Sequence, residues 1–235
     1  EGEYSSIGWH EQDDLDCVLE FLYTVESVSK IIVWGRSMGA ITALLYSQRP
    51  SKISCLILDS PFADFERLVK EFAKNRAYIP GFVTGGILNI LRRTILKKAD
   101  FDIEDIKPIK VVDKISIPAL FSAAKNDTFV SPEHSKDLYK KFKGPKELFL
   151  FEGDHNTHRP LNWLLAVMTF IKKSLSQDSS KENTQSVKET THKQQAKNEE
   201  SQKIIANVIQ CNINNGPLWI NKKTNSSCVS TIDQT

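Results

Sequence analysis

A serine stands at the centre of a Gly-x-Ser-x-Gly motif, Gly35-Arg36-Ser37-Met38-Gly39, between an apolar β-rich run and a helix-forming run. A serine hydroxyl is a weak nucleophile, and it must stand clear of a sheet where a base can reach it. A sharp turn between a strand and a helix provides that position, and this context is typical of a nucleophile elbow. We expect Gly35 and Gly39 to permit the turn, because neither has a Cβ to clash with the neighbouring backbone.

Two more residues with catalytic chemistry follow later apolar runs, in the order Asp127 and His155. An imidazole titrates near neutral pH, so His155 can take the proton of Ser37 and later give it to a leaving group. A carboxylate can hold that ring in one tautomer, and Asp127 is predicted to do so. The backbone N–H of Met38 is predicted to be one donor to the oxyanion.

Other residues compete for these roles. Asp59 also follows an apolar run, and Asp154 directly precedes the histidine, so both are alternatives to Asp127 as the acid. Asp59 is otherwise expected to cap the turn at Pro61. His134 follows Asp127 by a few residues and is the reserve base, although its place on an amphipathic helix predicts a solvated side chain.

Alternating apolar and amphipathic runs predict the elements that position these residues. Strands are expected at 31–34, 53–58, 118–124 and 147–151, and helices at 10–27, 38–48, 62–72, 87–98, 108–115, 132–142 and 160–175. Strands that alternate with helices predict a largely parallel sheet, in which reactive groups gather at the carboxyl ends of strands. Ser37, Asp127 and His155 all lie directly after predicted strands.

The insertion over about 79–107 is predicted to be a small helical cap with a glycine-rich entry at Gly81, Gly85 and Gly86. Its basic residues are expected to form a solvated helix face, with an anionic ligand or a membrane surface as the alternative; they are Arg92, Arg93, Lys97 and Lys98. Residues 176–202 contain almost nothing apolar, which predicts a disordered polar tail over 176–235 after a folded domain over 1–175.

The composition, with 40% hydrophobic and 26% charged residues, is that of a globular protein, and a net charge of +2 is too small to indicate a nucleic-acid partner. Cys17, Cys55, Cys211 and Cys228 are far apart, which favours a reducing, cytoplasmic setting. Asp154, His155 and His158 lie in one loop without further ligands at metal-binding spacing, so neither a metal nor another cofactor is expected.

With these residues in view, the chain resembles the α/β-hydrolase superfamily, and within it the serine-aminopeptidase-like (S33-type) and ABHD17-like hydrolases of plants and protists. The resemblance rests on 30–46, Leu58-Asp59-Ser60-Pro61-Phe62, 117–120 with Asn126-Asp127, and Glu152-Gly153-Asp154-His155-Asn156. It implies a mostly parallel sheet with helices on both faces and an acyl-enzyme formed on Ser37. An ester or thioester with an acyl or lipid-like group is the favoured substrate; the alternatives are a serine peptidase and a non-catalytic binding protein of the same fold.

The resemblance fails before residue 30. An α/β-hydrolase has several strands before its nucleophile strand, and an early loop supplies the second oxyanion donor. We therefore expect the chain to be N-terminally incomplete, to lack that second donor and to present its nucleophile strand as a sheet edge. Loss of one oxyanion donor typically lowers the rate by on the order of 10²–10³, so little activity is expected of the chain as given. The oligomeric state stays open.

Overall fold

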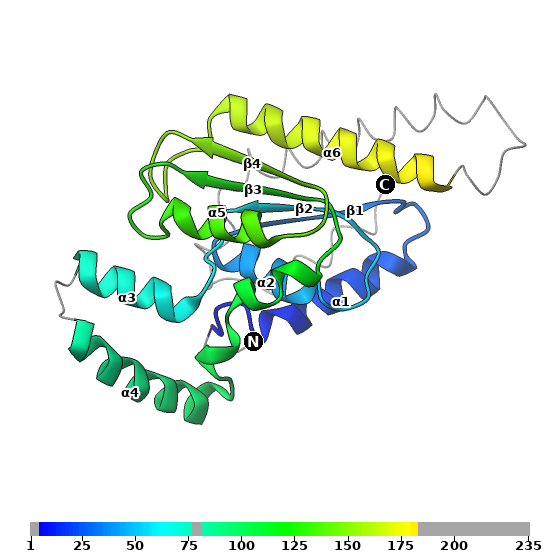
Figure 1. Cartoon of the computed structure of the whole chain (residues 1–235). Coiled ribbons are helices and arrows are strands. Elements are labelled where there is room, and N and C mark those ends of the chain that lie inside the picture. Colours follow the sequence, from blue (N-terminus) through cyan, green and yellow to red (C-terminus); the bar gives the residue numbers. More distant parts are fainter. Residues whose placement is uncertain (1–4, 77–80, 183–235) are drawn as a thin grey trace, which may run out of the picture. The chain divides into compact units, whose positions relative to one another are not determined.

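The computed structural model describes residues 5–76 and 81–182, and its centre is a parallel sheet of four strands in the order β1-β2-β3-β4 (Figure 1). The strands are β1 (Ile31–Arg36), β2 (Ile53–Asp59), β3 (Ala119–Ala124) and β4 (Lys146–Phe151). Each strand pairs in parallel with the one before it, and a helical crossover separates consecutive strands. The predicted parallel sheet is thus confirmed, with β1 at one edge of it.

Helices cover both faces of this sheet (Figure 1). One face carries α1 (Glu11–Thr24), α2 (Met38–Tyr46) and α5 (Pro132–Lys141), and the other carries α6 (Leu161–Glu182). Leu56 and Leu58 of β2 pack in the core beneath α1, α2 and α5, whereas Cys55 and Ile57 pack with Trp163 of α6. Successive side chains of a strand point to opposite faces, so one apolar run serves two cores.

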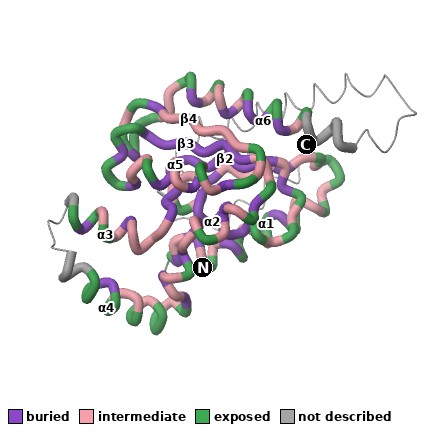
Figure 2. Tube along the Cα trace, viewed as in Figure 1, coloured by how far each residue is buried: buried purple, intermediate pink, exposed green. Residues whose placement is uncertain are grey.

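A third apolar cluster lies outside the sheet and joins α2 to the insertion. It contains Ile41 of α2, Leu68 of α3 (Phe65–Arg76) and Leu88 of α4 (Gly81–Ala99). Three 3-10 turns then lead to β3, at Ile103–Asp105, Pro108–Lys110 and Val112–Lys114. Much of α4 from residue 85 onward is exposed (Figure 2).

Two helix boundaries differ most from the prediction. Helix α4 begins at Gly81, so Gly85 and Gly86 lie within it and do not form a loop. Each glycine costs a helix about 1 kcal/mol, but a helix already nucleated by an apolar run gains one hydrogen bond for each residue added. Helix α6 continues to Glu182, beyond its predicted end at Leu175. The rest of the predicted tail lies outside the described residues.

His134 is fully buried, although the helix pattern predicted a solvated side chain. Its Nδ1 accepts the N–H of Ala63 at 3.1 Å, so Nε2 carries the proton and donates to Glu71 Oε2 at 3.1 Å. The ring therefore joins α5 to α3 and to the turn before it. Burial is the main effect that lowers the pKa of His134, and Glu71 partly opposes it.

We expect His134 to make the stability of the fold depend on pH. The pKa of an unfolded histidine is about 6.5. Because the folded-state pKa of His134 is lower, its contribution to the unfolding free energy is complete above the unfolded-state pKa of about 6.5. That contribution is lost as the pH falls through the folded-state pKa. His134→Asn keeps an acceptor for Ala63, so its unfolding free energy should vary less between about pH 7 and about pH 5 than that of the wild type.

Urea denaturation at each pH measures this difference. His158→Asn is the control, because His158 is exposed. The charged neighbours of His134, which are Glu71, Asp137 and Arg67, remain in every variant, so they contribute to all three profiles. Equal pH dependence in the wild type and in His134→Asn would show that the prediction is wrong.

Candidate active site

Ser37 links β1 to α2 through a backbone conformation that side chains rarely adopt. Its φ is +51° and its ψ is −115°, a geometry that costs on the order of 1–3 kcal/mol. The Ser37 N–H donates to the Asp59 carbonyl at 2.8 Å, and the Ser37 carbonyl accepts from Ala40 and Ile41 at 3.0 and 3.2 Å. These bonds to β2 and α2 hold the turn. The predicted sharp, strained backbone at Ser37 is confirmed, and its role as a nucleophile elbow stays a prediction.

The two motif glycines serve this turn differently. A Cβ on Gly35 would lie 2.3 Å from the carbonyl carbon and oxygen of Gly39 and 2.5 Å from the nitrogen of Ala40. A Cβ on Gly39 would meet nothing within 4 Å, so the expectation that Gly39 also prevents a clash is wrong. The main chain of Gly39 occupies the space beside Gly35, and only Gly35 must lack a side chain.

Met38 is the first residue of α2. The first N–H groups of a helix have no acceptor within the helix, and the helix dipole places partial positive charge there. The Met38 amide therefore stands where an anion beside Ser37 is stabilised. Its role as an oxyanion donor stays a prediction.

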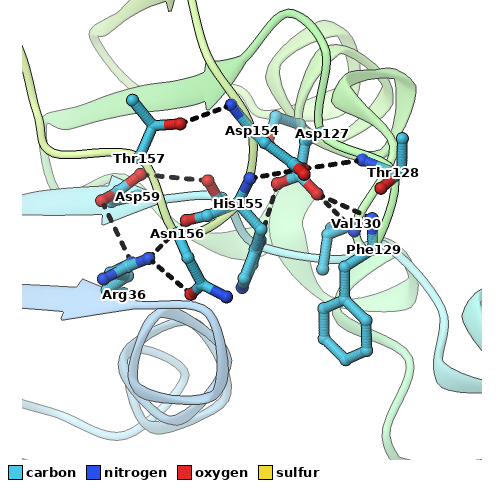
Figure 3. A network of polar contacts seen from close by, with 12 residues as sticks. Arg36, Asp59, Asp127, Thr128, Phe129, Val130, Asp154, His155, Asn156 and Thr157 are labelled. Atoms are coloured by element: carbon cyan, nitrogen blue, oxygen red, sulfur yellow. Dashed lines mark hydrogen bonds and ion pairs between the residues drawn. The ribbon is translucent and has the colours of Figure 1, made fainter.

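The structure brings His155 and Asp127 together (Figure 3). His155 Nδ1, in the loop after β4, lies 2.6 Å from Asp127 Oδ2, in the loop after β3. The Asp127 side chain is fully buried and the His155 side chain is 11% exposed. Asp127 Oδ1 accepts the N–H groups of Phe129 and Val130 at 2.9 and 2.8 Å. These two bonds orient the carboxylate. Because a carboxylate can only accept hydrogen bonds, Nδ1 must carry the ring proton, and Nε2 is left as the basic nitrogen.

Asp154, an alternative acid, binds main chain instead of the imidazole. Its Oδ1 accepts the N–H of His155 at 2.7 Å and the N–H of Thr128 at 3.1 Å (Figure 3). Its own N–H donates to Thr157 Oγ1 at 2.8 Å. Asp154 thus shapes the loop that carries His155 and connects it to the loop that carries Asp127.

Asp59, the other alternative acid, is paired with arginines. Arg159 Nε and Nη2 donate to Asp59 Oδ2 and Oδ1 at 2.8 and 3.1 Å, and Arg36 Nε lies 3.9 Å from Oδ2. The expected cap at Pro61 is replaced by this pairing. Sequence reasoning missed both arginines. For Arg36 the available signal was an arginine inside the serine motif, opposite an aspartate that ends the adjacent strand.

Exposed apolar side chains lie beside the imidazole. The ring of Phe129 contacts the ring of His155 with centroids 5.1 Å apart, and the ring of Phe72 lies 5.9 Å beyond it. Phe129 is 46% exposed and Phe72 is 43% exposed. Large exposed aromatic side chains next to polar groups are typical of a surface that binds an apolar ligand.

Within residues 5–76 and 81–182, no group of three His, Cys, Asp or Glu side chains is arranged to hold a metal ion. No helix in this part of the chain has the length and apolarity needed to cross a bilayer.

Cys55 lies buried in β2 as predicted, and burial raises the pKa of its thiol to about 12.

Comparison with known families and relatives gives matches over much of the chain. The model of a family described as PhoPQ-activated pathogenicity-related protein matches residues 63–215, a region that includes Asp127 and His155 and begins after Ser37. The uncharacterized protein YqkD of Bacillus subtilis (strain 168) is 31% identical over 158 residues, which cover 66% of this chain and 51% of YqkD. The α/β-hydrolase domain-containing protein WAV2 of Arabidopsis thaliana is 32% identical over 117 residues, covering 48% of this chain and 35% of WAV2. The chain thus spans about half the length of YqkD, or less in the case of WAV2.

Solved structures share the fold. The Pyrococcus furiosus esterase Pf2001 matches with a TM-score of 0.55 at 22% identity, covering 73% of this chain and 65% of the esterase. The acetyl xylan esterase of Paenibacillus sp. R4 matches with a TM-score of 0.52 at 23% identity, covering 70% of this chain and 52% of that esterase. At such identities the likeness concerns the fold, which is the predicted α/β-hydrolase fold.

Replacing Gly35 should destabilise the protein far more than replacing Gly39. In Gly35→Ala the new Cβ meets main-chain atoms that cannot turn away, so we expect a loss of about 3 kcal/mol or more of unfolding free energy. Gly39→Ala adds a methyl group in open space within a helix, and should change stability by about 1 kcal/mol or less, in the stabilising direction. Thermal and urea denaturation of both variants test this, and equal losses would contradict it.

Proposed function

Because the chain belongs to the family of PhoPQ-activated pathogenicity-related proteins and to the α/β-hydrolase superfamily, we propose that it is a serine hydrolase that cleaves esters or thioesters through an acyl-enzyme. Ser37 is the nucleophile, His155 the base and Asp127 the acid. The observation that carries the proposal is the 2.6 Å hydrogen bond between His155 Nδ1 and Asp127 Oδ2, at the strand ends where Ser37 also lies.

In the proposed reaction, Ser37 Oγ attacks the substrate carbonyl carbon while its proton passes to His155 Nε2. The carbonyl oxygen becomes an oxyanion beside the N–H of Met38, and the Asp127 carboxylate stabilises the imidazolium. The bond to the leaving oxygen or sulfur then breaks, and that atom takes the proton from Nε2. Water repeats the sequence on the acyl-enzyme: it loses its proton to Nε2, and Ser37 Oγ regains a proton as the acid departs.

The apolar surface of Phe129 and Phe72 favours an apolar acyl group as the part of the substrate bound next to His155. Each methylene that such a surface removes from water contributes about 0.8 kcal/mol when fully buried. This supports an ester or thioester of a carbon chain over a peptide, whose charged terminus requires a polar partner.

A fluorophosphonate probe and an activated ester test the assignment together. Ser37→Ala should lose all labelling and turnover, because the attacking oxygen is gone. Asp127→Asn should lower kcat/KM by on the order of 10³–10⁴, because an amide in place of the carboxylate favours the wrong tautomer of His155. Asp137→Asn on α5 removes a carboxylate that binds Arg67 and is the matched control, expected to keep wild-type rates.

A wild-type protein that folds but neither reacts with the probe nor cleaves any acyl ester or thioester would contradict the proposal. That outcome would favour a binding protein built on the same fold. Labelling that survives in Ser37→Ala would show that another nucleophile reacts.

Chain-length preference tests the apolar surface separately. Phe72→Ala should lower the ratio of kcat/KM for a hexanoyl ester to that for an acetyl ester about three- to tenfold, because several methylenes lose their contact while the acetyl group never reached it. Phe21→Ala on α1 removes a ring that is 59% exposed and should leave the ratio unchanged. The substrate surface would have to lie elsewhere if both variants kept the wild-type ratio.

A further inference from the structure

Asp59 contacts both parts of the proposed site without touching the imidazole. Its main-chain carbonyl accepts the N–H of Ser37 at 2.8 Å. Its carboxylate, with a side chain only 2% exposed, accepts two hydrogen bonds from Arg159 and lies 3.9 Å from Nε of Arg36. One residue at the end of β2 thus reaches the nucleophile through its backbone and two cations through its side chain.

Both guanidinium groups converge on the main chain of the histidine loop. Arg36 Nη2 donates to the carbonyl of His155 and, at 3.2 Å, to Asn156 Oδ1 (Figure 3). Arg159 Nη1 donates to the same His155 carbonyl at 3.2 Å and to the Thr157 carbonyl at 2.6 Å. A carbonyl oxygen has two lone pairs, so it can accept both donors. The backbone of His155 is therefore held from two directions.

The two arginines can share this carbonyl because Asp59 lies between them. Burial and then the neighbouring Arg159 lower the pKa of Arg36, while Asp59 raises it, so the carboxylate offsets the repulsion between two cations. Guanidinium groups stay protonated in proteins, so both remain charged donors.

The arginines are themselves anchored to the sheet. Arg36 is the last residue of β1 and lies in register with Asp59 of β2. The Arg159 guanidinium stacks over the ring of Phe151, the last residue of β4, at 4.7 Å from its centroid. The group thus joins the ends of three strands to the loop that carries the proposed base.

We propose that Asp59, Arg36 and Arg159 form a positioning clamp that fixes the main chain of His155, and with it Nε2, relative to Ser37. The clamp serves the proposed hydrolase reaction, and its effect on rate rests on that function. Proton transfer between Ser37 and His155 requires their atoms within hydrogen-bond reach, and a misplacement of about 1 Å can cost about 10²-fold in rate. The loop after β4 has no regular secondary structure to set this distance, and the clamp sets it.

Two variants weaken the clamp without removing Asp59. Arg36→Met deletes one donor to the His155 carbonyl. Arg159→Lys keeps a positive charge for Asp59, but an ammonium group cannot reproduce the planar fork that binds the carboxylate and the two carbonyls at once. Arg49→Met is the matched control, because Arg49 lies away from the His155 loop, just after α2, and pairs only with Asp13 and Asp16 among the ion pairs of the described residues.

Two measurements are made on each variant. The imidazole ¹⁵N chemical shifts of His155, assigned by their loss in His155→Gln, report which ring nitrogen carries the proton and need no substrate. We expect the Nδ1–H tautomer in the wild type and in Arg49→Met, and a mixture of tautomers in Arg36→Met and Arg159→Lys. For an activated ester, kcat should fall about tenfold in each clamp variant while KM stays within about twofold, because only alignment in the transition state is lost.

The outcomes separate this proposal from the proposed function. Wild-type ¹⁵N shifts and wild-type kcat in both folded clamp variants, with only a lower unfolding free energy, would show that the arginines are structural and would overturn the clamp. An inactive wild type whose His155 shifts still change in the clamp variants would overturn the hydrolase and leave the clamp standing. A loss of kcat together with the expected changes in the ¹⁵N shifts supports both the clamp and the hydrolase function. If Arg36→Met does not fold, the milder Arg159→Lys variant decides between a clamp and a purely structural role.

Discussion

A single buried carboxylate holds the end of this sheet together. Asp59 ends β2, its backbone carbonyl binds the N–H of Ser37, and its side chain pairs with Arg159 and lies near Arg36. Burying a charge is unfavourable unless it is paired and hydrogen-bonded, so the carboxylate requires cations. Those cations in turn bind the carbonyl of His155, which makes the elbow and the histidine loop parts of one polar network.

The sheet supplies the geometry in which this network can form. Parallel strands end at the same edge, so residues that follow β1, β2, β3 and β4 meet there although they are far apart in the chain. The two central strands, β2 and β3, are buried on both faces, and close packing against the helices leaves their ends little freedom to move. A strained residue such as Ser37 persists because its surroundings over-determine its conformation.

The polar network faces an apolar surface, and this contrast suits acyl transfer. Asp127 is buried and bonded by backbone N–H groups, whereas Phe129 and Phe72 are about half exposed beside the ring of His155. Fixed dipoles stabilise developing charge without reorganisation during the reaction. The apolar side chains are the ones left open to a ligand.

The sequence by itself determined the features that depend on short stretches of chain. The four strands, the elbow at Ser37 and the order of Asp127 and His155 could be predicted, because apolar runs and a turn motif are local patterns. Only the tertiary structure decided what meets across the sheet: that Asp127 and not Asp59 binds the imidazole, that His134 is buried between helices, and that arginines hold the histidine loop. Those contacts join residues separated by many positions, and no local pattern specifies the partner of a buried charge.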